Sequence, residues 1–263
     1  CLENRKTLAR VMAEPLALPD FPPDGPWSAY VLLIIWMPLI LRILFLVFPF
    51  RKAIKKLGKY GMANSVKHLR TFWKNKRVFV TGHTGFKGTW LSIYLDLLGA
   101  KIFGYSLKAP KNSLFNQTNC SKLIEKNFYG NVNDLNNLKK KILLSKPNII
   151  FHLAAQPLVS NSFQDPIDTF QTNIIGTANL LESALTINST KAIVIITTDK
   201  VYKNNNKNIS FKENDELGGK DPYSASKSCA EIIVNSFKES FLKNNKNRLN
   251  LATARSGNVL GGG

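Results

Sequence analysis

Three glycines spaced three residues apart constrain the fold of this chain more than any other feature. Gly82, Gly85 and Gly88 follow an apolar run, 77–81, and open an amphipathic stretch, 86–98. In a strand–turn–helix unit of this kind, the first glycine permits a tight turn and the second lets the backbone approach phosphates, while the third allows the helix to pack closely on the strand. The helix N-terminus then faces the anion. The order of these features therefore predicts a pyrophosphate-binding turn in a parallel α/β unit.

The same alternation of short β-branched runs and longer amphipathic stretches continues to the end of the chain. Further strands are predicted over 101–105, 127–129, 148–153, 191–197 and 250–254, and further helices over 133–145, 166–184 and 223–243. This alternation is typical of βαβ units with a parallel sheet. We therefore predict an α/β fold, with a Rossmann-type doubly wound parallel sheet over residues 62–263.

An apolar segment, 29–50, precedes this domain and is long enough to span a bilayer as a helix. Arg42 and Pro38 count against a span, because a charge near the middle of a membrane helix is costly. Basic residues without any acidic one follow at 51–59, which would place the rest of the chain on the inner face of a membrane. The segment is thus predicted to form an N-terminal apolar helix.

Two interpretations of residues 1–61 stay open, because the composition changes abruptly near Met62. Seven of the 12 prolines precede Met62, and residues 1–76 hold 13 basic but only 4 acidic side chains. Residues 1–61 are either an extension that contacts a membrane through 29–59 or an unrelated upstream segment. At the other end, the chain stops at 261–263 just after a predicted strand, so we expect a truncated C-terminal substrate domain.

Composition also excludes some classes of protein. Lys and Arg outnumber Asp and Glu by 36 to 17, but no helix-turn-helix, zinc-finger or aromatic-plus-basic pattern accompanies the excess, so no nucleic-acid partner is predicted. The three cysteines and three histidines are scattered, without the spacing of a disulfide framework or a metal site. We predict a reducing, cytoplasmic setting and no metal.

Two groups of side chains have the spacing that chemistry requires. Tyr223 and Lys227 lie four residues apart at the start of a predicted helix, so they share a face, and the ammonium is expected to lower the phenol pKa from its reference value near 10. Thr198, Asp199 and Lys200 end a predicted strand, where an open parallel sheet presents residues to its ligand. An acid and a second ionisable group after the hydroxyl supply a proton donor for a leaving hydroxyl and a base for a C–H bond.

Together with the 153–156 segment, these motifs resemble the extended short-chain dehydrogenase/reductase family over about residues 75–263. The resemblance implies that the 154–156 segment lines the ribose and nicotinamide side of the cofactor and that 131–132 lies near the adenine. Asn131 stands where the family often has Asp, and an amide can still form a hydrogen bond. The implied cofactor-binding residues are Gly82, Thr84, Gly85, Phe86, Gly88, Asn131, Val132, Leu153, Ala154, Ala155, Gln156, Asn173, Tyr223 and Lys227.

The choice of cofactor rests on the resemblance, which implies NAD. Enzymes that use NAD usually place an acidic residue on the adenosine ribose after the second strand. Here that region, 105–108, contains no acid, and Lys108 would favour a 2′-phosphate. NADP therefore stays open.

Four blocks, 82–92, 154–159, 218–224 and 257–263, resemble the CDP-glucose 4,6-dehydratase group within that family. The resemblance implies a homodimeric lyase of deoxysugar and lipopolysaccharide O-antigen biosynthesis, which converts CDP-glucose to CDP-4-keto-6-deoxyglucose with internally recycled NAD. It also implies a role for each catalytic residue. Tyr223, with Lys227 and Thr198, would take the 4-hydroxyl proton, Lys200 would take the C5 proton, and Asp199 would protonate the departing 6-hydroxyl.

Three alternatives remain. Inverting UDP-GlcNAc 4,6-dehydratases also carry Lys at the place of Lys200, and some of their relatives are membrane-anchored. A nucleotide-sugar 4-epimerase lacks the elimination step, and the Asp199–Lys200 pair argues against it. An alternative of another class is a non-catalytic, membrane-tethered nucleotide-binding fragment, since the nucleotide base would be recognised mainly by the truncated domain.

Overall fold

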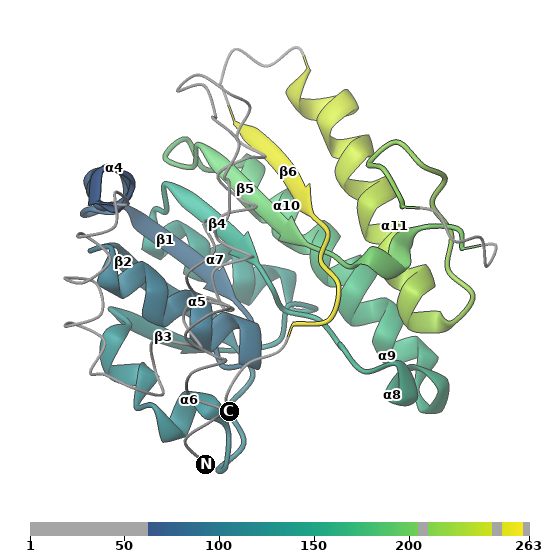
Figure 1. Cartoon of the computed structure of the whole chain (residues 1–263), viewed down its shortest axis with the longest axis horizontal. Coiled ribbons are helices and arrows are strands. Elements are labelled where there is room, and N and C mark those ends of the chain that lie inside the picture. The colour runs from purple at the N-terminus through teal and green to yellow at the C-terminus, as the bar shows by residue number, and fades with distance from the viewer. Residues whose placement is uncertain (1–62, 205–209, 244–248, 260–263) are drawn as a thin grey trace, which may run out of the picture.

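The computed structural model describes residues 63–204, 210–243 and 249–259 of the chain, and its centre is a six-stranded sheet (Figure 1). The strands are β1 (Arg77–Thr81), β2 (Lys101–Ser106), β3 (Lys126–Tyr129), β4 (Ile149–His152), β5 (Ala192–Ile196) and β6 (Asn250–Ala254). They lie in the order β3-β2-β1-β4-β5-β6, and every neighbouring pair is parallel. This is the doubly wound order with a switch point between β1 and β4, so the predicted fold class is confirmed.

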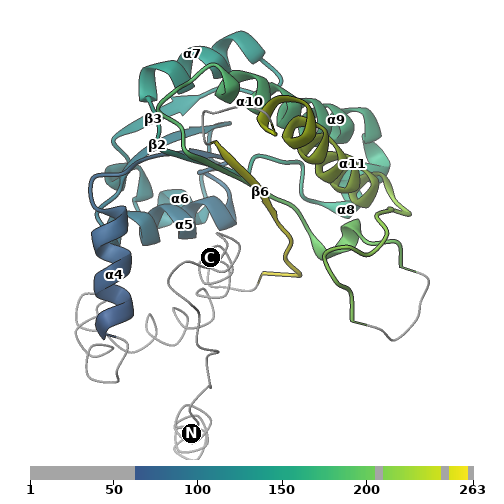
Figure 2. The ribbon, with the colours of Figure 1, turned by 90° about the horizontal axis from the view of Figure 1, so that it is seen from above.

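Helices cover both faces of the sheet, as Figure 2 shows: α5 and α6 lie on one side and α7, α10 and α11 on the other. The α-helices are α4 (Ala63–Trp73), α5 (Phe86–Leu97), α6 (Leu114–Gln117), α7 (Leu135–Ser145), α8 (Val159–Gln164), α9 (Pro166–Phe170), α10 (Gly176–Leu185) and α11 (Pro222–Phe237). Because βαβ crossovers are right-handed, the units on either side of the switch point place their helices on opposite faces.

The helix predicted over 166–184 is continuous but not regular. It consists of α9, a π-helical turn η3 (Gln171–Ile175) and α10, and α11 likewise runs on into a π-helical turn η5 (Lys238–Leu242). π-turns of this kind occur often at functional sites. The short helices α6 and α8 were not predicted, because four to six residues are too few to show a helical period.

Two apolar clusters, one on each face of the sheet, form the core. Val78 and Val80 of β1 pack with Leu95 of α5 on one face, whereas Phe79 packs with Leu138 of α7 on the other. Successive residues of a strand point to opposite faces, and both faces are covered here. The central strands therefore read as continuous apolar runs, which made them easy to predict.

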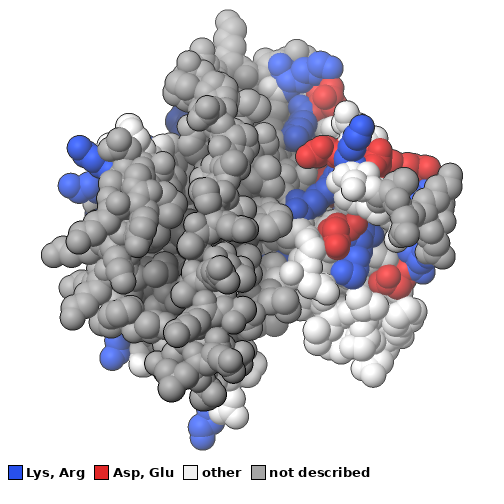
Figure 3. All heavy atoms as spheres, viewed as in Figure 1, with Lys and Arg blue, Asp and Glu red and all other residues white. Residues whose placement is uncertain are grey.

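The predicted apolar helix over 29–50, and any packing of residues 1–61, lie outside the described residues. Among the helices that the structure does describe, none is both long and apolar enough to cross a membrane. On the described surface visible at the right of Figure 3, acidic and basic side chains are interspersed.

Candidate active site

The glycine turn has the backbone that its sequence predicted. Gly82 has a φ of +70°, and a Cβ at this residue would come within 2.6 Å of the Ala154 nitrogen, so only glycine fits. A Cβ on Gly88 would run into the Gly82 carbonyl, whereas a Cβ on Gly85, which is exposed, would meet nothing closer than the same carbonyl at 3.4 Å. Gly85 is also the N-cap of α5 and carries no side chain to bond the first amides of the helix. The turn thus packs tightly inward and leaves an anion-binding helix end open outward.

Hydrogen bonds between buried hydroxyl and imidazole groups join the carboxyl ends of β1 and β4. Thr81 Oγ1 lies 2.8 Å from His152 Nδ1 and accepts the amides of Leu153 and Ala154, both at 3.2 Å. On the other side of the ring, His152 Nε2 lies 3.3 Å from Thr177 Oγ1, which itself donates to a backbone carbonyl. His152 must therefore donate from Nε2 and accept at Nδ1. Burial, with the charge of Lys227, lowers its pKa to about 3, so the ring is neutral.

We expect the protein to lose stability steeply as the pH falls from about 6.5 towards 4, the window between the unfolded-state pKa and the lowered folded-state values. Burial lowers the pKa of His83 to about 4 and that of His152 to about 3, so the unfolded chain binds protons that the folded chain does not. Each histidine contributes a fall of about 1.4 kcal/mol per pH unit. Urea unfolding at pH 7, 6 and 5 measures the slope. The variant His152→Asn should show a shallower slope, and an unchanged slope would contradict the assignment.

The loop after β4 is held by Asn173, which is buried in η3. Its Oδ1 accepts the Gln156 amide at 2.8 Å, and its Nδ2 donates to the Gln156 carbonyl at 3.1 Å and to Ser226 Oγ at 2.8 Å. The Gln156 side chain donates to Thr169 Oγ1 at 2.9 Å. Both polar atoms of the Asn173 side chain are thus hydrogen-bonded within the protein. Asn173 therefore positions the loop of Ala154 and Ala155 against α11.

The ends of β2 and β3 form the side expected to receive adenosine. Thr84 is buried and bonds Ser106 Oγ at 2.8 Å and the Leu107 carbonyl at 3.0 Å. Asn131 is exposed, with its Oδ1 accepting the Asn133 amide at 2.9 Å. Val132 is buried beneath it against Gly176. The structure thus places the 131–132 turn at the same sheet edge as the glycine turn.

Helix α11 brings Tyr223 and Lys227 to the end of β5. Lys227 is buried and donates from Nζ to the Ile196 carbonyl at 3.0 Å. Burial lowers its pKa to about 8, and the nearby ammonium of Lys87 acts in the same direction. Tyr223 is half-buried and hydrogen-bonded to Thr198.

The prediction that Lys227 lowers the Tyr223 pKa is wrong for this structure. Burial raises the pKa of the phenol, the hydrogen bond with Thr198 offsets part of that rise, and the carboxylates of Asp199 and Asp221 add to it. The Lys227 ammonium is engaged with a strand carbonyl instead. In this state Tyr223 is a protonated phenol.

The segment after β5 places the predicted acid and base side by side. Thr198 caps a short 3₁₀ turn, η4 (Asp199–Val201), and donates from Oγ1 to Asp199 Oδ1 at 3.1 Å. Lys200 Nζ lies 3.4 Å from the same Asp199 oxygen and 3.4 Å from Asn258 Oδ1. Thr198, Asp199, Lys200 and Tyr223 therefore come together, as predicted.

Two charged residues of this region were missed by sequence reasoning. Lys87, in the first turn of α5, donates from Nζ to Ser256 Oγ at 3.1 Å. Burial lowers the pKa of Lys87, Asp199 opposes that change, and Lys200 adds to it. Glu231 is buried and binds Arg255 through both carboxylate oxygens, at 3.1 Å each. Lys87 lies between Gly85 and Gly88, and Glu231 lies four residues after Lys227 on the same helix. Their nearness to these motifs in the sequence could have marked both as residues of the site.

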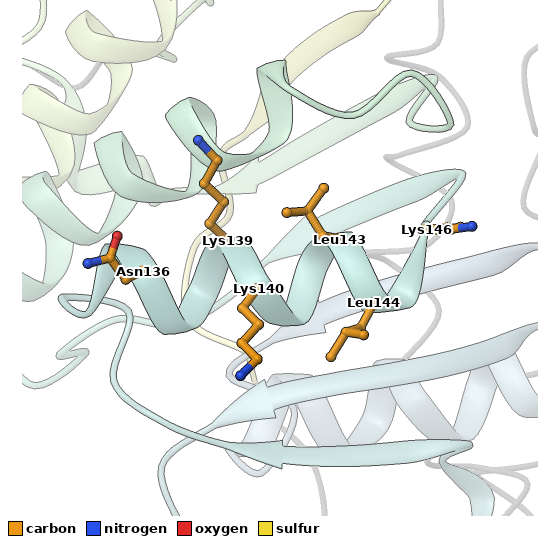
Figure 4. Close-up of a pocket in the computed structure, with 6 residues that line it drawn as sticks. All are labelled: Asn136, Lys139, Lys140, Leu143, Leu144 and Lys146. Carbon is orange, nitrogen blue, oxygen red and sulfur yellow. The ribbon is translucent and has the colours of Figure 1, made fainter.

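A cavity of about 450 Å³ lies elsewhere, on the outer side of α7 (Figure 4). It is lined by Asn136, Lys139, Lys140, Leu143, Leu144 and Lys146. None of these residues belongs to the predicted site, which lies at the carboxyl ends of the strands.

Known proteins resemble the chain over this same region. The family described as GDP-mannose 4,6 dehydratase matches residues 79–249. A CDP-glucose 4,6-dehydratase of Salmonella typhimurium is 46% identical over 198 residues, which cover 74% of this chain and 55% of the relative. A dTDP-D-glucose 4,6-dehydratase of Dictyostelium discoideum is 33% identical over 200 residues, which cover 71% of this chain and 44% of the relative.

The fold is likewise that of solved structures. The UDP-glucose 4-epimerase of Thermus thermophilus, solved as a complex with NAD, superimposes with a TM-score of 0.57 and 26% identity, over 68% of this chain and 54% of that one. The chain thus spans about half the length of the proteins that it matches.

Proposed function

The chain belongs to the GDP-mannose 4,6 dehydratase family, and we propose that residues 62–263 are the NAD-binding part of a nucleotide-sugar 4,6-dehydratase, a lyase, that acts on CDP-glucose. The observation that carries this proposal is the Asp199–Lys200 pair, which lies beside Thr198 and Tyr223 at the end of β5. A redox site needs only the hydroxyl groups, whereas an elimination needs an acid and a base as well.

The residues of the glycine turn fit a dinucleotide. Gly85 leaves space at the N-terminus of α5 for a pyrophosphate, and a side chain on Gly82 or Gly88 would fill the turn. Ala154 and Ala155 present small side chains after β4, and the 131–132 turn borders the adenine side. When bound, NAD supplies a hydride acceptor for the sugar C4 and a positive charge beside it.

We expect Gly88→Ala to weaken NAD binding at least tenfold, because the new methyl would push the Gly82 carbonyl and open the turn. Isothermal titration of the chain with NAD measures the affinity, and thermal unfolding checks that the variant folds. Gly99→Ala is the control for a strained glycine substitution away from the site, since Gly99 has a positive φ, +84°, and lies at the opposite end of α5. Equal affinity of Gly88→Ala and the parent would count against the proposed site.

Tyr223 is the group that begins the reaction. As a phenolate it takes the proton of the sugar 4-hydroxyl, with Thr198 hydrogen-bonded alongside, while the C4 hydrogen would leave as hydride to the acceptor that bound NAD supplies. Burial and the carboxylates of Asp199 and Asp221 oppose the phenolate, so the proposal requires a positive charge beside Tyr223, which bound NAD would supply. The product of this step is a 4-ketone.

Elimination then uses the pair after β5. The ketone acidifies the C5 proton, which Lys200 takes as the base, and Asp199 acts as the acid that gives a proton to the departing 6-hydroxyl. The C5–H and C6–O bonds break, water leaves, and a C5–C6 double bond forms. A 4-keto-6-deoxy sugar would result once C6 gains the hydride that the reduced cofactor would supply and C5 regains the proton that Lys200 took, so the cofactor would be unchanged overall.

The choice of CDP-glucose is supported by the 46% identity to the Salmonella typhimurium enzyme. Inverting UDP-GlcNAc 4,6-dehydratases and 4-epimerases are the alternatives. We also propose a cytoplasmic homodimer. Free thiols at Cys120 and Cys229 suit a reducing compartment, and Ile167 of α9 and Ile232 of α11 are exposed apolar side chains that a second copy would cover. A membrane tether through 29–59 stays a prediction, since that segment lies outside the described residues.

The complete gene product, mixed with NAD and separately with CDP-glucose, UDP-glucose and UDP-GlcNAc, tests the proposal. We expect CDP-4-keto-6-deoxyglucose from CDP-glucose, identified by mass and NMR. Epimerised sugar without loss of water would identify a 4-epimerase, and product from UDP-GlcNAc alone would identify the inverting group.

A further inference from the structure

Strand β2 ends between the glycine turn and the 131–132 turn. The Gly82 amide donates to the Tyr105 carbonyl at 2.9 Å, and the Gly130 amide donates to the Ser106 carbonyl at 2.9 Å. Ser106 is the last residue of β2. In a dinucleotide, the adenosine ribose connects the pyrophosphate to the adenine. With the pyrophosphate at the glycine turn and the adenine at the 131–132 turn, that ribose is therefore expected beside Ser106.

The hydroxyl group of Ser106 has a direction that the neighbouring groups determine. Thr84 and Ser106 are both buried, and their hydroxyl oxygens lie 2.8 Å apart. Thr84 Oγ1 also lies 3.0 Å from the Leu107 carbonyl, which can only accept a hydrogen bond. A hydroxyl has one hydrogen and two lone pairs. Because Thr84 donates its hydrogen to Leu107, Ser106 donates its own to Thr84, and the Ser106 oxygen can then only accept.

A hydroxyl in this state can take the role of a carboxylate. In NAD-binding folds, an acidic residue about 20 residues after the glycines accepts the hydrogen bond of the ribose 2′-hydroxyl. Ser106 follows Gly88 by 18 residues, and its oxygen can accept the same bond. The oxygens of a 2′-phosphate are acceptors as well. NADP would therefore bring its lone pairs against those of Ser106, with no hydrogen between them.

Lys108 is the charge that opposes this preference. It is exposed and lies two residues beyond Ser106. An exposed ammonium gains little from a phosphate, because solvent screens the pair and the side chain loses freedom. A buried acceptor that is left without a donor costs more. The second effect is the larger one, so the end of β2 favours NAD.

We propose that Ser106 is the residue that distinguishes NAD from NADP: its hydroxyl, held as an acceptor by Thr84, binds the 2′-hydroxyl of the adenosine ribose and rejects a 2′-phosphate. Ser106 thus takes the place of the acid that the 105–108 region lacks. This inference rests on the proposed function, in which the glycine turn holds the cofactor.

Isothermal titration of the complete protein with three ligands tests this inference: NAD, NADP, and NAD that lacks the 2′-hydroxyl on its adenosine ribose. The parent protein should bind NAD about tenfold more tightly than either of the others, the effect of one hydrogen bond whose loss leaves a buried acceptor without a partner. Ser106→Ala removes the acceptor. Its affinity for NAD should fall about tenfold, and its affinities for the three ligands should come within about threefold of one another.

Two variants of Thr84 test the direction of the hydrogen bond. Thr84→Val removes the group that receives the Ser106 hydrogen, which then becomes available to a phosphate. NADP should gain on NAD in this variant, whereas Thr84→Ser keeps the hydroxyl and should keep the parent preference. These variants also test the inference if Ser106→Ala does not fold, which thermal unfolding shows.

Ser145→Ala is the matched control, because Ser145 is a buried serine at the end of α7 whose hydroxyl donates to the Lys141 carbonyl at 2.7 Å. It should bind all three ligands as the parent does. A purely structural role for Ser106 would weaken the three ligands by one common factor. That result, or equal binding of NAD and NADP by the parent protein, overturns this inference and leaves the proposed function standing. If the parent protein binds neither cofactor, the proposed function fails as well.

Discussion

Tyr223→Phe is expected to stop the reaction before reduced nicotinamide forms, whereas Lys200→Ala and Asp199→Asn are expected to stop it afterwards. The phenol acts on the 4-hydroxyl before any other chemistry is possible, while the acid and base are needed only once the ketone exists. Loss of one acid or base group typically costs about 100- to 10,000-fold in rate. The two dehydration variants should therefore accumulate bound reduced cofactor.

Absorbance of reduced nicotinamide, followed after mixing the complete protein with NAD and CDP-glucose, separates the two outcomes, with product measured in parallel. Lys203→Ala is the matched control, because Lys203 is an exposed lysine three residues further along that pairs with Glu216 at 2.7 Å, away from the site. If Lys200→Ala forms product at the parent rate, Lys200 is structural and the dehydratase assignment loses its main support.

Glu231→Ala is expected to lower the free energy of unfolding by about 3–5 kcal/mol, the cost of breaking a buried ion pair from one side. Burial opposes ionisation of Glu231, but hydrogen bonds from Arg255, Thr197 and Thr253 hold its pKa below the usual value. Thr197 Oγ1 donates to Oε1 at 2.5 Å and Thr253 Oγ1 to Oε2 at 2.8 Å. Without the carboxylate, the side chains of Thr197 after β5, Thr253 in β6 and Arg255 after β6 lose the acceptor that they share.

Urea unfolding at pH 7 measures this loss of stability. Two further variants show whether it comes from the buried ion pair. Glu239→Ala breaks an exposed ion pair with Lys243 on the same helical segment and should change stability little. The double variant Glu231→Leu/Arg255→Met replaces the pair by apolar side chains and should recover part of the loss. A Glu231→Ala protein as stable as Glu239→Ala would show that the carboxylate does not hold α11 to the sheet.

Much of the fold was determined locally and could be read from the sequence. Strand and helix periods differ, so the alternation over 77–254 predicted the elements, and parallel strands require that their carboxyl ends meet at one edge. For that reason the glycine turn, Thr198 to Lys200 and Tyr223 could be placed together in advance. The bounds of β1 and β6 agree with their prediction, because apolar runs bounded by polar residues mark both.

What the sequence could not determine are the contacts between remote segments and the charges that depend on them. Lys87 meets Ser256 across 169 residues, and Glu231 gathers donors that follow two different strands. The direction of the Tyr223 pKa was wrong from sequence, because spacing on a helix placed Lys227 on the right face but said nothing of the carbonyl that receives its ammonium or of the burial around the phenol. Distance and desolvation set a pKa, and both exist only once the chain is folded.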